Sequence, residues 1–336
     1  GAGCGLGRAG GCGVWVGGVM LEAGIHFGVP EADYHADTLL PVPTLSSTLA
    51  RLVLARSPLH AWTAHPRLNP DFEPTEKKTF DIGRAAHRAV LGRGSDYAAY
   101  PAEYLASNGA ASTKEAKAWA EEQRAEGRTP LKFDEIDQIC AMAVSVNRQL
   151  AAMGIKLDPT RSEVVALAEV DGVACRAMID NAPADPRHPL YDLKTTMDAS
   201  PESLAKTVAS YGYDLQAAHY LAVWKAATGE DRRFRIIFVE KEAPYGVQVA
   251  ELYRKPGDEA DWFDHADALA RDARRIWGEC LRSGNWPCYP SRVAVIGAPG
   301  WHLTKMEDRS GRAAIGKPAA DTVARASAWQ SPEGVN

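Results

Sequence analysis

The sequence predicts an α/β fold in which one central mixed β-sheet is flanked by helices. Residues 46–154 carry apolar side chains at helical spacing, whereas residues 162–194 contain three short runs that are typical of strands. Helical and strand-like patterns then alternate as far as residue 283. A single sheet covered by helices is the simplest architecture for a hairpin, a further strand, crossover helices and two closing strands in succession.

The first helical segments surround a serine-proline pair. Residues 46–62 read as a helix that begins near Ser46, is interrupted at Ser57-Pro58 and then continues. After a polar loop, "FDIGRAAHRAVLG" has one apolar face and ends at Gly92, a residue suited to a helix C-terminus. Two helices are therefore expected before residue 93, the first of them broken.

Two more helices are expected before the strands begin. Ser112 and Glu115 have the spacing of a capping box, which predicts that a charged, exposed helix starts there and runs to about Glu126. "FDEIDQICAMAVSVNRQLAAMG" predicts a longer, largely buried helix that is closed by Gly154.

The strand pattern starts at residue 162. "SEVVALAEV", "VACRAMID" and "PLYDLK" are separated by Asp171-Gly172 and by a proline-rich segment, which predicts a hairpin followed by another strand. Ser200 and Pro201 then indicate the start of a helix.

The remaining elements end near residue 290. "DLQAAHYLAVWKAATG" predicts a helix that closes at Gly229, and "RFRIIFVEK" and "GVQVAELY" predict two strands. Residues 258–283 predict an amphipathic helix, and from about residue 290 the chain turns polar and irregular.

Composition limits the class of protein. The chain of 336 residues is 46% hydrophobic and 24% charged, as in ordinary globular proteins, and its net charge of −5 gives no overall basic footprint. Six cysteines occur without a C-x-x-C pair or a Cys/His cluster, which argues against a zinc site and a disulfide framework and favours reduced thiols in the cytoplasm. No stretch approaches the roughly 20 apolar residues of a membrane span.

The two ends differ in composition from the rest. Residues 1–19 are rich in glycine, and their G-x-G-x-x-G at 5–10 lacks the preceding strand that a dinucleotide-binding turn requires. A signal peptide would need a cleavage site, and no convincing one follows the apolar run. We expect residues 1–19 to be a non-native or disordered leader, residues 20–295 to form one domain, and residues 296–336 to be a flexible polar tail.

The triplet Asp192-Leu193-Lys194 stands out at the end of a predicted buried strand. Strand alternation sends Asp192 and Lys194 to the same side, where a plain ion pair is the simplest interpretation. Asp180 closes the neighbouring strand, however, and two carboxylates at adjacent strand ends can share a divalent cation. The pattern is therefore compatible with a metal site as well as with an ion pair.

Four further candidates accompany the triplet. Gln216 and Tyr220 lie four residues apart on one helical face and could orient a phosphate or a water molecule, although an amphipathic helix edge would look the same. His87 reads either as a buried core histidine or as a ligand, and Glu163 reads as a strand-edge residue or as part of a site.

Along the chain the candidates follow the order His87, Glu163, Asp180, Asp192-Leu193-Lys194, Gln216 and Tyr220. This order resembles the PD-(D/E)XK nuclease superfamily, and more closely the RecE-type (exonuclease VIII-like) phage and prophage exonucleases. The segments that carry the resemblance extend over roughly residues 24–290, and they are "GIHFGVPEADYHAD", "LSSTLARLVLARSPLHAW", "FDIGRAAHRAVLG", "CRAMID", "YDLKTTMDAS" and "YGYDLQAAHYL". The chain departs from the pattern in having Ile179-Asp180 where Pro-Asp would stand. The resemblance implies a restriction-endonuclease-like core and an exonuclease domain over residues 20–295.

The resemblance also implies a metal centre. Asp180, Asp192, the Leu193 backbone carbonyl and His87 match metal ligands, for Mg²⁺ or alternatively Mn²⁺. Lys194 matches the lysine that positions or deprotonates the attacking water, and partial desolvation beside a cation would bring its pKa towards that of a general base.

The same resemblance implies contacts to DNA. Gln216 and Tyr220 match a helix pair that contacts DNA or supports the site, and Glu163 matches less securely. Three arginine clusters could contact phosphates or could be solvated faces: Arg84/Arg88/Arg93, Arg232/Arg233/Arg235 and Arg271/Arg274/Arg275. Some related nucleases carry an iron–sulfur cluster. This chain lacks the late cysteines that such a cluster needs as ligands.

The expected function is that of a cytoplasmic, bacterial or phage-encoded exonuclease that hydrolyses duplex DNA from its ends for recombination or DNA processing. A ring-like homo-oligomer and a single-strand annealing partner follow from the resemblance. Two alternatives remain at this point, namely a structure-specific or nicking endonuclease with the same core, and a DNA-binding recombination accessory protein with a silent nuclease fold.

Overall fold

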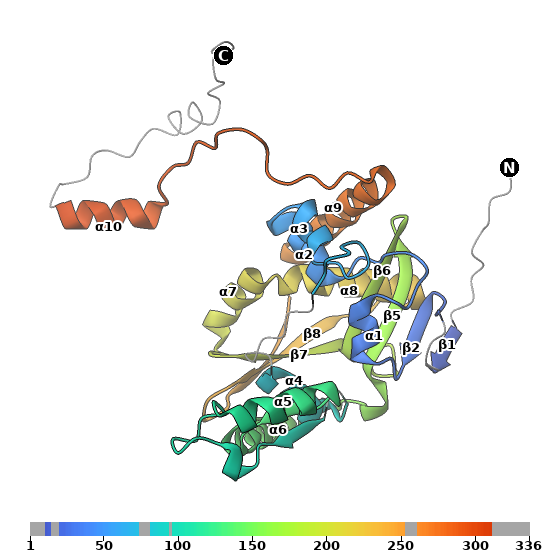
Figure 1. The fold of residues 1–336 in the computed structure, drawn as a ribbon. Coiled ribbons are helices and arrows are strands. Elements are labelled where there is room, and N and C mark those ends of the chain that lie inside the picture. Colours follow the sequence, from blue (N-terminus) through green and yellow to red (C-terminus); the bar gives the residue numbers. More distant parts are fainter. Residues whose placement is uncertain (1–10, 15–19, 74–80, 94–95, 253–260, 311–336) are drawn as a thin grey trace. The chain divides into compact units, whose positions relative to one another are not determined.

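The computed structural model describes residues 11–14, 20–73, 81–93, 96–252 and 261–310 (Figure 1). The chain divides into two units, Gly1–Cys288 and Tyr289–Asn336, whereas we place the domain end at residue 295. The second unit contains helix α10 (Gly300–Ser310), although we predict irregular structure there. Everything that builds the candidate site belongs to the first unit.

A seven-stranded mixed sheet is the centre of the first unit, which confirms the predicted fold class. Its strands are, in spatial order, β1 (Gly11–Val14), β2 (Gly24–Phe27), β5 (Ser162–Val170), β6 (Val173–Asn181), β7 (Leu190–Thr196), β8 (Phe234–Glu240) and β9 (Val247–Glu251). The β1–β2 and β7–β8 pairs are parallel and the other pairs are antiparallel. A separate parallel pair is formed by β3 (Tyr97–Ala99) and β4 (Thr129–Leu131).

Part of the predicted leader joins this sheet. Residues 11–14 form the edge strand β1, which runs parallel to β2. For these four residues the expectation of a leader outside the fold needs correction, because strand pairing uses backbone N–H and C=O groups and does not require side chains. Residues 1–10 and 15–19 lie outside the described residues.

The predicted helices are present, with small shifts at their ends. The helices of the first unit are α1 (Glu31–Ala36), α2 (Ser47–Ala55), α3 (Pro58–Thr63), α4 (Asp81–Leu91), α5 (Lys114–Ala125), α6 (Phe133–Ala152), α7 (Pro201–Tyr211), α8 (Tyr213–Thr228) and α9 (Trp262–Ser283), with short 3-10 turns at Ala102–Tyr104 and Pro159–Arg161. Ser46 and Ser57 cap α2 and α3 through their side chains, as the predicted interruption requires. The cap of α5 is Thr113 and not Ser112, because the Thr113 hydroxyl accepts the N–H of Ala116.

Two groups of helices cover the sheet (Figure 1). Helices α2, α8 and α9 pack on one face and form the larger hydrophobic core with β5, β6 and the inward side chains of β8. Helices α4 and α6 pack on the other face, over β7, β8 and β9. Helix α8 has buried side chains from Leu215 to Ala227, so its sheet-facing residues are held against the sheet.

A buried ion network anchors α1 to the sheet. Arg176 of β6 lies 2.5 Å from Asp37 Oδ1, and its guanidinium also stacks 5.3 Å from the ring centre of Tyr34. Asp37 Oδ2 accepts the N–H of Thr44 at 2.9 Å and lies 3.0 Å from Nε2 of His65. Because these groups are buried, each charge depends on its partners.

The β5–β6 hairpin sets the register of the site strands. Its turn is Asp171-Gly172, as predicted, and both residues have positive φ angles, 53° and 73°. Along β6, Cys175, Ala177 and Ile179 belong to the core under α8. The alternate residues Arg176, Met178 and Asp180 therefore point to the opposite face of the sheet.

Candidate active site

The sheet opens between β6 and β7. These strands share one paired position, Asn181 opposite Tyr191, whereas β7 pairs with β8 along its whole length. Past that position the backbone N–H of Leu193 donates to Asp180 Oδ2 at 2.7 Å instead of to a strand neighbour. The two predicted strand-end carboxylates, Asp180 and Asp192, thus flank an opening in the sheet.

Asp192 and Lys194 project to the same side of β7, as strand alternation predicts. Lys194 Nζ lies 2.5 Å from Asp192 Oδ2, and the side chains are 20% and 1% exposed respectively. The other carboxylate oxygen, Oδ1, accepts a hydrogen bond of 2.9 Å from Gln216 Nε2 on α8. Gln216 therefore fixes the orientation of the Asp192 carboxylate. This is a more specific role than that of a polar residue at the edge of an amphipathic helix.

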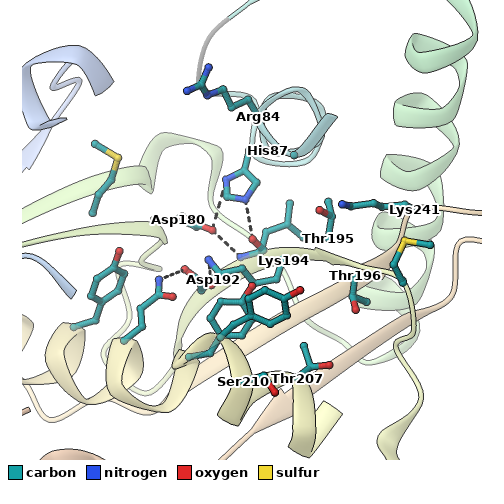
Figure 2. Close-up of a pocket in the computed structure, with 18 of the residues that line it drawn as sticks. Arg84, His87, Asp180, Asp192, Lys194, Thr195, Thr196, Thr207, Ser210 and Lys241 are labelled. Carbon is teal, nitrogen blue, oxygen red and sulfur yellow. Dashed lines mark hydrogen bonds and ion pairs between the residues drawn. The ribbon is translucent and has the colours of Figure 1, made fainter. Parts of the chain in front are cut away.

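His87 reaches the opening from α4. Its Nε2 lies 2.7 Å from the Leu193 carbonyl oxygen, and its Nδ1 lies 3.7 Å from Asp180 Oδ2. Figure 2 shows His87 pointing towards Asp180 and the backbone of β7. The structure thus places His87 against two of the predicted oxygen ligands, and it is not a core histidine.

Tyr220 and Glu163 also line the cavity at this opening. Tyr220 is buried one turn after Gln216 on α8. Glu163 has a left-handed backbone conformation, with φ 53°. Burial raises the pKa of Glu163, and the nearby carboxylates of Asp180 and Glu31 raise it further. All the site residues predicted from the sequence therefore gather around one cavity.

The charges at the centre are strongly coupled. Burial raises the pKa of Asp192 to about 6, against the attraction of Lys194 and with a further increase from Asp180. Burial lowers the pKa of Lys194, but Asp192 and Asp180 raise it more, so the net pKa lies above the usual value for lysine. Our expectation of a lysine with a lowered pKa therefore needs correction for this state, in which Lys194 is an ammonium paired with a carboxylate.

The cavity has a volume of about 1050 Å³ and extends well beyond these residues. Sequence reasoning missed its other walls, which include Glu31, Tyr34 and His35 of α1, Ser203, Lys206, Thr207, Ser210 and Tyr211 of α7, and Tyr213 and Lys241. No local pattern marks them, because they meet only in the folded chain. Figure 2 shows Arg84 and His87 on one side of β7, and Thr207 and Ser210 on the other.

The arginine clusters divide into different roles. Arg84 lines the cavity. Arg232 and Arg274 are buried, Arg232 against Glu230 and Arg274 against Asp171, so these two are neither phosphate contacts nor solvated residues. Arg274 lies against the β5–β6 turn, and Arg232 donates to the carbonyl oxygens of Pro183 and His188 in the connection before β7.

The residues at the opening fit a divalent cation of the Mg²⁺ type. Two carboxylates and the Leu193 carbonyl supply hard oxygen donors, and the buried Asp192 carboxylate has a raised pKa, which a cation would lower. Among the described residues, no three His, Cys, Asp or Glu side chains form a metal cage by themselves. Mg²⁺ commonly binds through one or two carboxylates and completes its shell with water and substrate phosphate, which matches this donor set.

Comparison with known proteins adds the family and the fold. Residues 54–296 match the family described as "PDDEXK-like domain of unknown function (DUF3799)". A "Putative exonuclease" from Eubacterium rectale of known structure is 14% identical, with a TM-score of 0.51 over 82% of this chain and 97% of that chain. A phage related exonuclease from Haemophilus somnus 129PT is 11% identical, with a TM-score of 0.31 over 74% and 99% of the two chains. At such identities the likeness concerns the fold alone, and no curated protein matches the chain.

In the part of the chain that the structure describes, no helix combines the length and the apolar character that crossing a bilayer requires.

Proposed function

The chain belongs to the PDDEXK-like family DUF3799, and from that premise we propose that it is a metal-dependent deoxyribonuclease that degrades duplex DNA from its ends. The observation that carries the proposal is the opening between β6 and β7, where Asp180, Asp192 and the Leu193 carbonyl meet beside Lys194. An open cavity around this group gives a phosphodiester room to approach. The RecE-type assignment within the superfamily is part of the proposal.

Each residue at the opening has a distinct task in this proposal. Asp180, Asp192 and the Leu193 carbonyl would hold the cation, with His87 as the further ligand predicted from the resemblance. Gln216 keeps the Asp192 carboxylate in one orientation, and the N–H of Leu193 does the same for Asp180. A bound divalent cation supplies charge neutralisation at the phosphate and lowers the pKa of water for attack.

Lys194 acts as a fixed positive charge. Its ammonium group lies at the cavity wall beside Asp192, where it can donate hydrogen bonds to a phosphate oxygen or to the attacking water. A preorganised cation in a partly buried site stabilises charge that develops in the transition state more than a solvated lysine would.

Exonuclease action is the finer part of the proposal. It is supported by the resemblance and by the name of the Eubacterium rectale protein with the similar fold. End-labelled linear duplex DNA and a closed circular duplex should each be incubated with the protein in two parallel reactions, one with Mg²⁺ and one with EDTA. We expect the linear duplex to be degraded in the Mg²⁺ reaction only, and the circular duplex to stay intact in both. Cleavage of the circle would favour the endonuclease alternative, and no cleavage of either substrate would favour the DNA-binding alternative.

We also propose a ring-like homo-oligomer that works with a single-strand annealing partner in recombination of the bacterial or phage type. A monomer with a net charge of −5 is expected to hold DNA weakly, whereas several copies around one channel would combine their basic residues. Light scattering combined with a competitor-trap digestion of long linear duplex tests this. A strict monomer that releases DNA after each cut would contradict it.

A further inference from the structure

The corner between α7 and α8 brings two tyrosines together. Tyr211 ends α7, Gly212 has a left-handed conformation with φ 69°, and Tyr213 begins α8. A side chain at position 212 would also meet Arg51, whose Cδ lies 2.8 Å from the place of a Cβ. The turn is therefore suited to glycine, and it aligns the rings of Tyr211 and Tyr213 at 5.6 Å between centroids and 16° between planes.

This stacked pair extends outwards from the catalytic lysine. Lys194 Nζ lies 5.3 Å from the ring centroid of Tyr213, and Tyr213 also contacts Phe238 of the sheet. Tyr211 is 60% exposed and lines the same cavity. Tyr213 is thus fixed from the protein side, and Tyr211 is the accessible end of the stack.

Basic and apolar groups surround the exposed ring. Lys206 of α7 and Lys241 after β8 line the cavity. Met197, which is exposed, lines the cavity as well. Figure 2 shows Lys241 beside Thr195 and Thr196 of β7. An aromatic ring with lysines alongside is the combination that binds single-stranded nucleic acid through base stacking and phosphate contacts.

We propose that Tyr211 is the stacking platform for one nucleobase of the strand that enters the site, with Lys206 and Lys241 contacting its phosphates. The proposal rests on the proposed nuclease function and specifies its substrate near the cut. Because Tyr213 covers one face of Tyr211, a single base stacks on the other face. That base is unpaired and belongs to a nucleotide a few positions from the scissile phosphate, so the site accepts a strand that is separated from its complement there.

The test measures whether the Tyr211 ring and one base of the bound strand contribute to affinity through the same contact. Binding of a labelled 12-nucleotide single strand is measured by anisotropy in EDTA, and single-turnover cleavage is measured with Mg²⁺. In a series of such strands, each strand carries a single abasic nucleotide at a different position. The variants are Tyr211→Ala and Tyr211→Phe, with Phe133→Ala as a control because Phe133 is 61% exposed and lies outside the cavity lining.

The wild-type protein should lose roughly five- to hundredfold in affinity when the abasic position coincides with the platform, as base–aromatic stacking predicts. Tyr211→Ala should show that loss on the intact strand and no additional loss at that abasic position. Tyr211→Phe should keep the discrimination, and Phe133→Ala should behave as wild type.

Two different failures are distinguishable. Wild-type protein that cleaves DNA, with Tyr211→Ala equal to it on intact and abasic strands, refutes the platform and leaves the nuclease proposal in place. Wild-type protein that neither binds nor cleaves any of the strands or linear duplexes refutes the nuclease function and the platform with it.

Discussion

Replacing Asp192 with asparagine should abolish hydrolysis and yet make the metal-free protein more stable. Asp192 is 1% exposed, and its pKa rises from the ordinary 3.8 to about 6, mainly through burial. Ionisation of Asp192 therefore destabilises the folded state relative to the unfolded state. The free energy of unfolding falls as the pH rises from 3.8 through 6. A shift of about 2 units at about 1.4 kcal/mol per unit amounts to roughly 3 kcal/mol at pH 8. Asparagine removes the charge and can keep the contact with Gln216 through Oδ1, but its amide N–H2 then faces the Lys194 ammonium, so about 3 kcal/mol is an upper bound.

Urea unfolding at pH 8 in EDTA should show Asp192→Asn to be more stable than wild type, by up to about 3 kcal/mol. Mg²⁺ should stabilise the wild-type protein by mass action and leave the variant unaffected. Asp231→Asn is the matched control, because Asp231 is an exposed carboxylate that pairs with Lys225 away from the site. A variant that is less stable than wild type in EDTA, or one that Mg²⁺ stabilises equally, would refute the reasoning.

Three further outcomes test other parts of the structure. Lys194→Ala should lower turnover by roughly 10²- to 10⁴-fold while calorimetry still detects Mg²⁺ binding, and a wild-type rate would contradict the role of this ammonium. Asp37→Ala should cost about 3–5 kcal/mol in urea unfolding at pH 7, because it leaves Arg176 buried without its carboxylate, and a loss below about 1 kcal/mol would contradict this. Burial lowers the pKa of His219 to about 4, so as the pH falls the unfolded chain binds a proton at this residue before the folded chain does. The free energy of unfolding should therefore fall by about 3 kcal/mol from pH 6.5 to pH 4. His219→Gln should lose less over that interval, and an equal loss would mean that other groups cause the acid sensitivity.

Much of the fold could be predicted because local chemistry and tertiary structure agree. The break at Ser57-Pro58 follows from the missing proline N–H, and the Asp171-Gly172 turn follows from its positive φ angles. The short strands β1 to β4 were not predicted, since three or four residues are too few for a pattern of alternation to be recognised. The α5 cap was misplaced by one residue because Ser112 and Thr113 are both good capping residues and only the backbone geometry selects one.

The site was predictable where one strand or one helix turn carries the information. The alternation of β7 places Asp192 beside Lys194, the end of the neighbouring strand marks Asp180, and the resemblance selects His87 as a ligand. What the sequence does not contain is the divergence of β6 and β7, which turns strand ends into an opening. The pKa of Lys194 could not be predicted for the same reason, because it depends on two carboxylates whose distances are set by the tertiary fold.

The alternation along β6 has a consequence for how the length of this chain can vary. Cys175, Ala177 and Ile179 face the core under α8, whereas Arg176 and Asp180 serve the α1 anchor and the opening. An inserted or deleted residue within β6 would exchange these faces, directing apolar side chains to the cavity and Asp180 into the core. The connection over residues 182–189 has no such alternation to preserve. Insertions and deletions among homologues should therefore fall in that connection, and an engineer who wishes to lengthen the chain near the site should do so there.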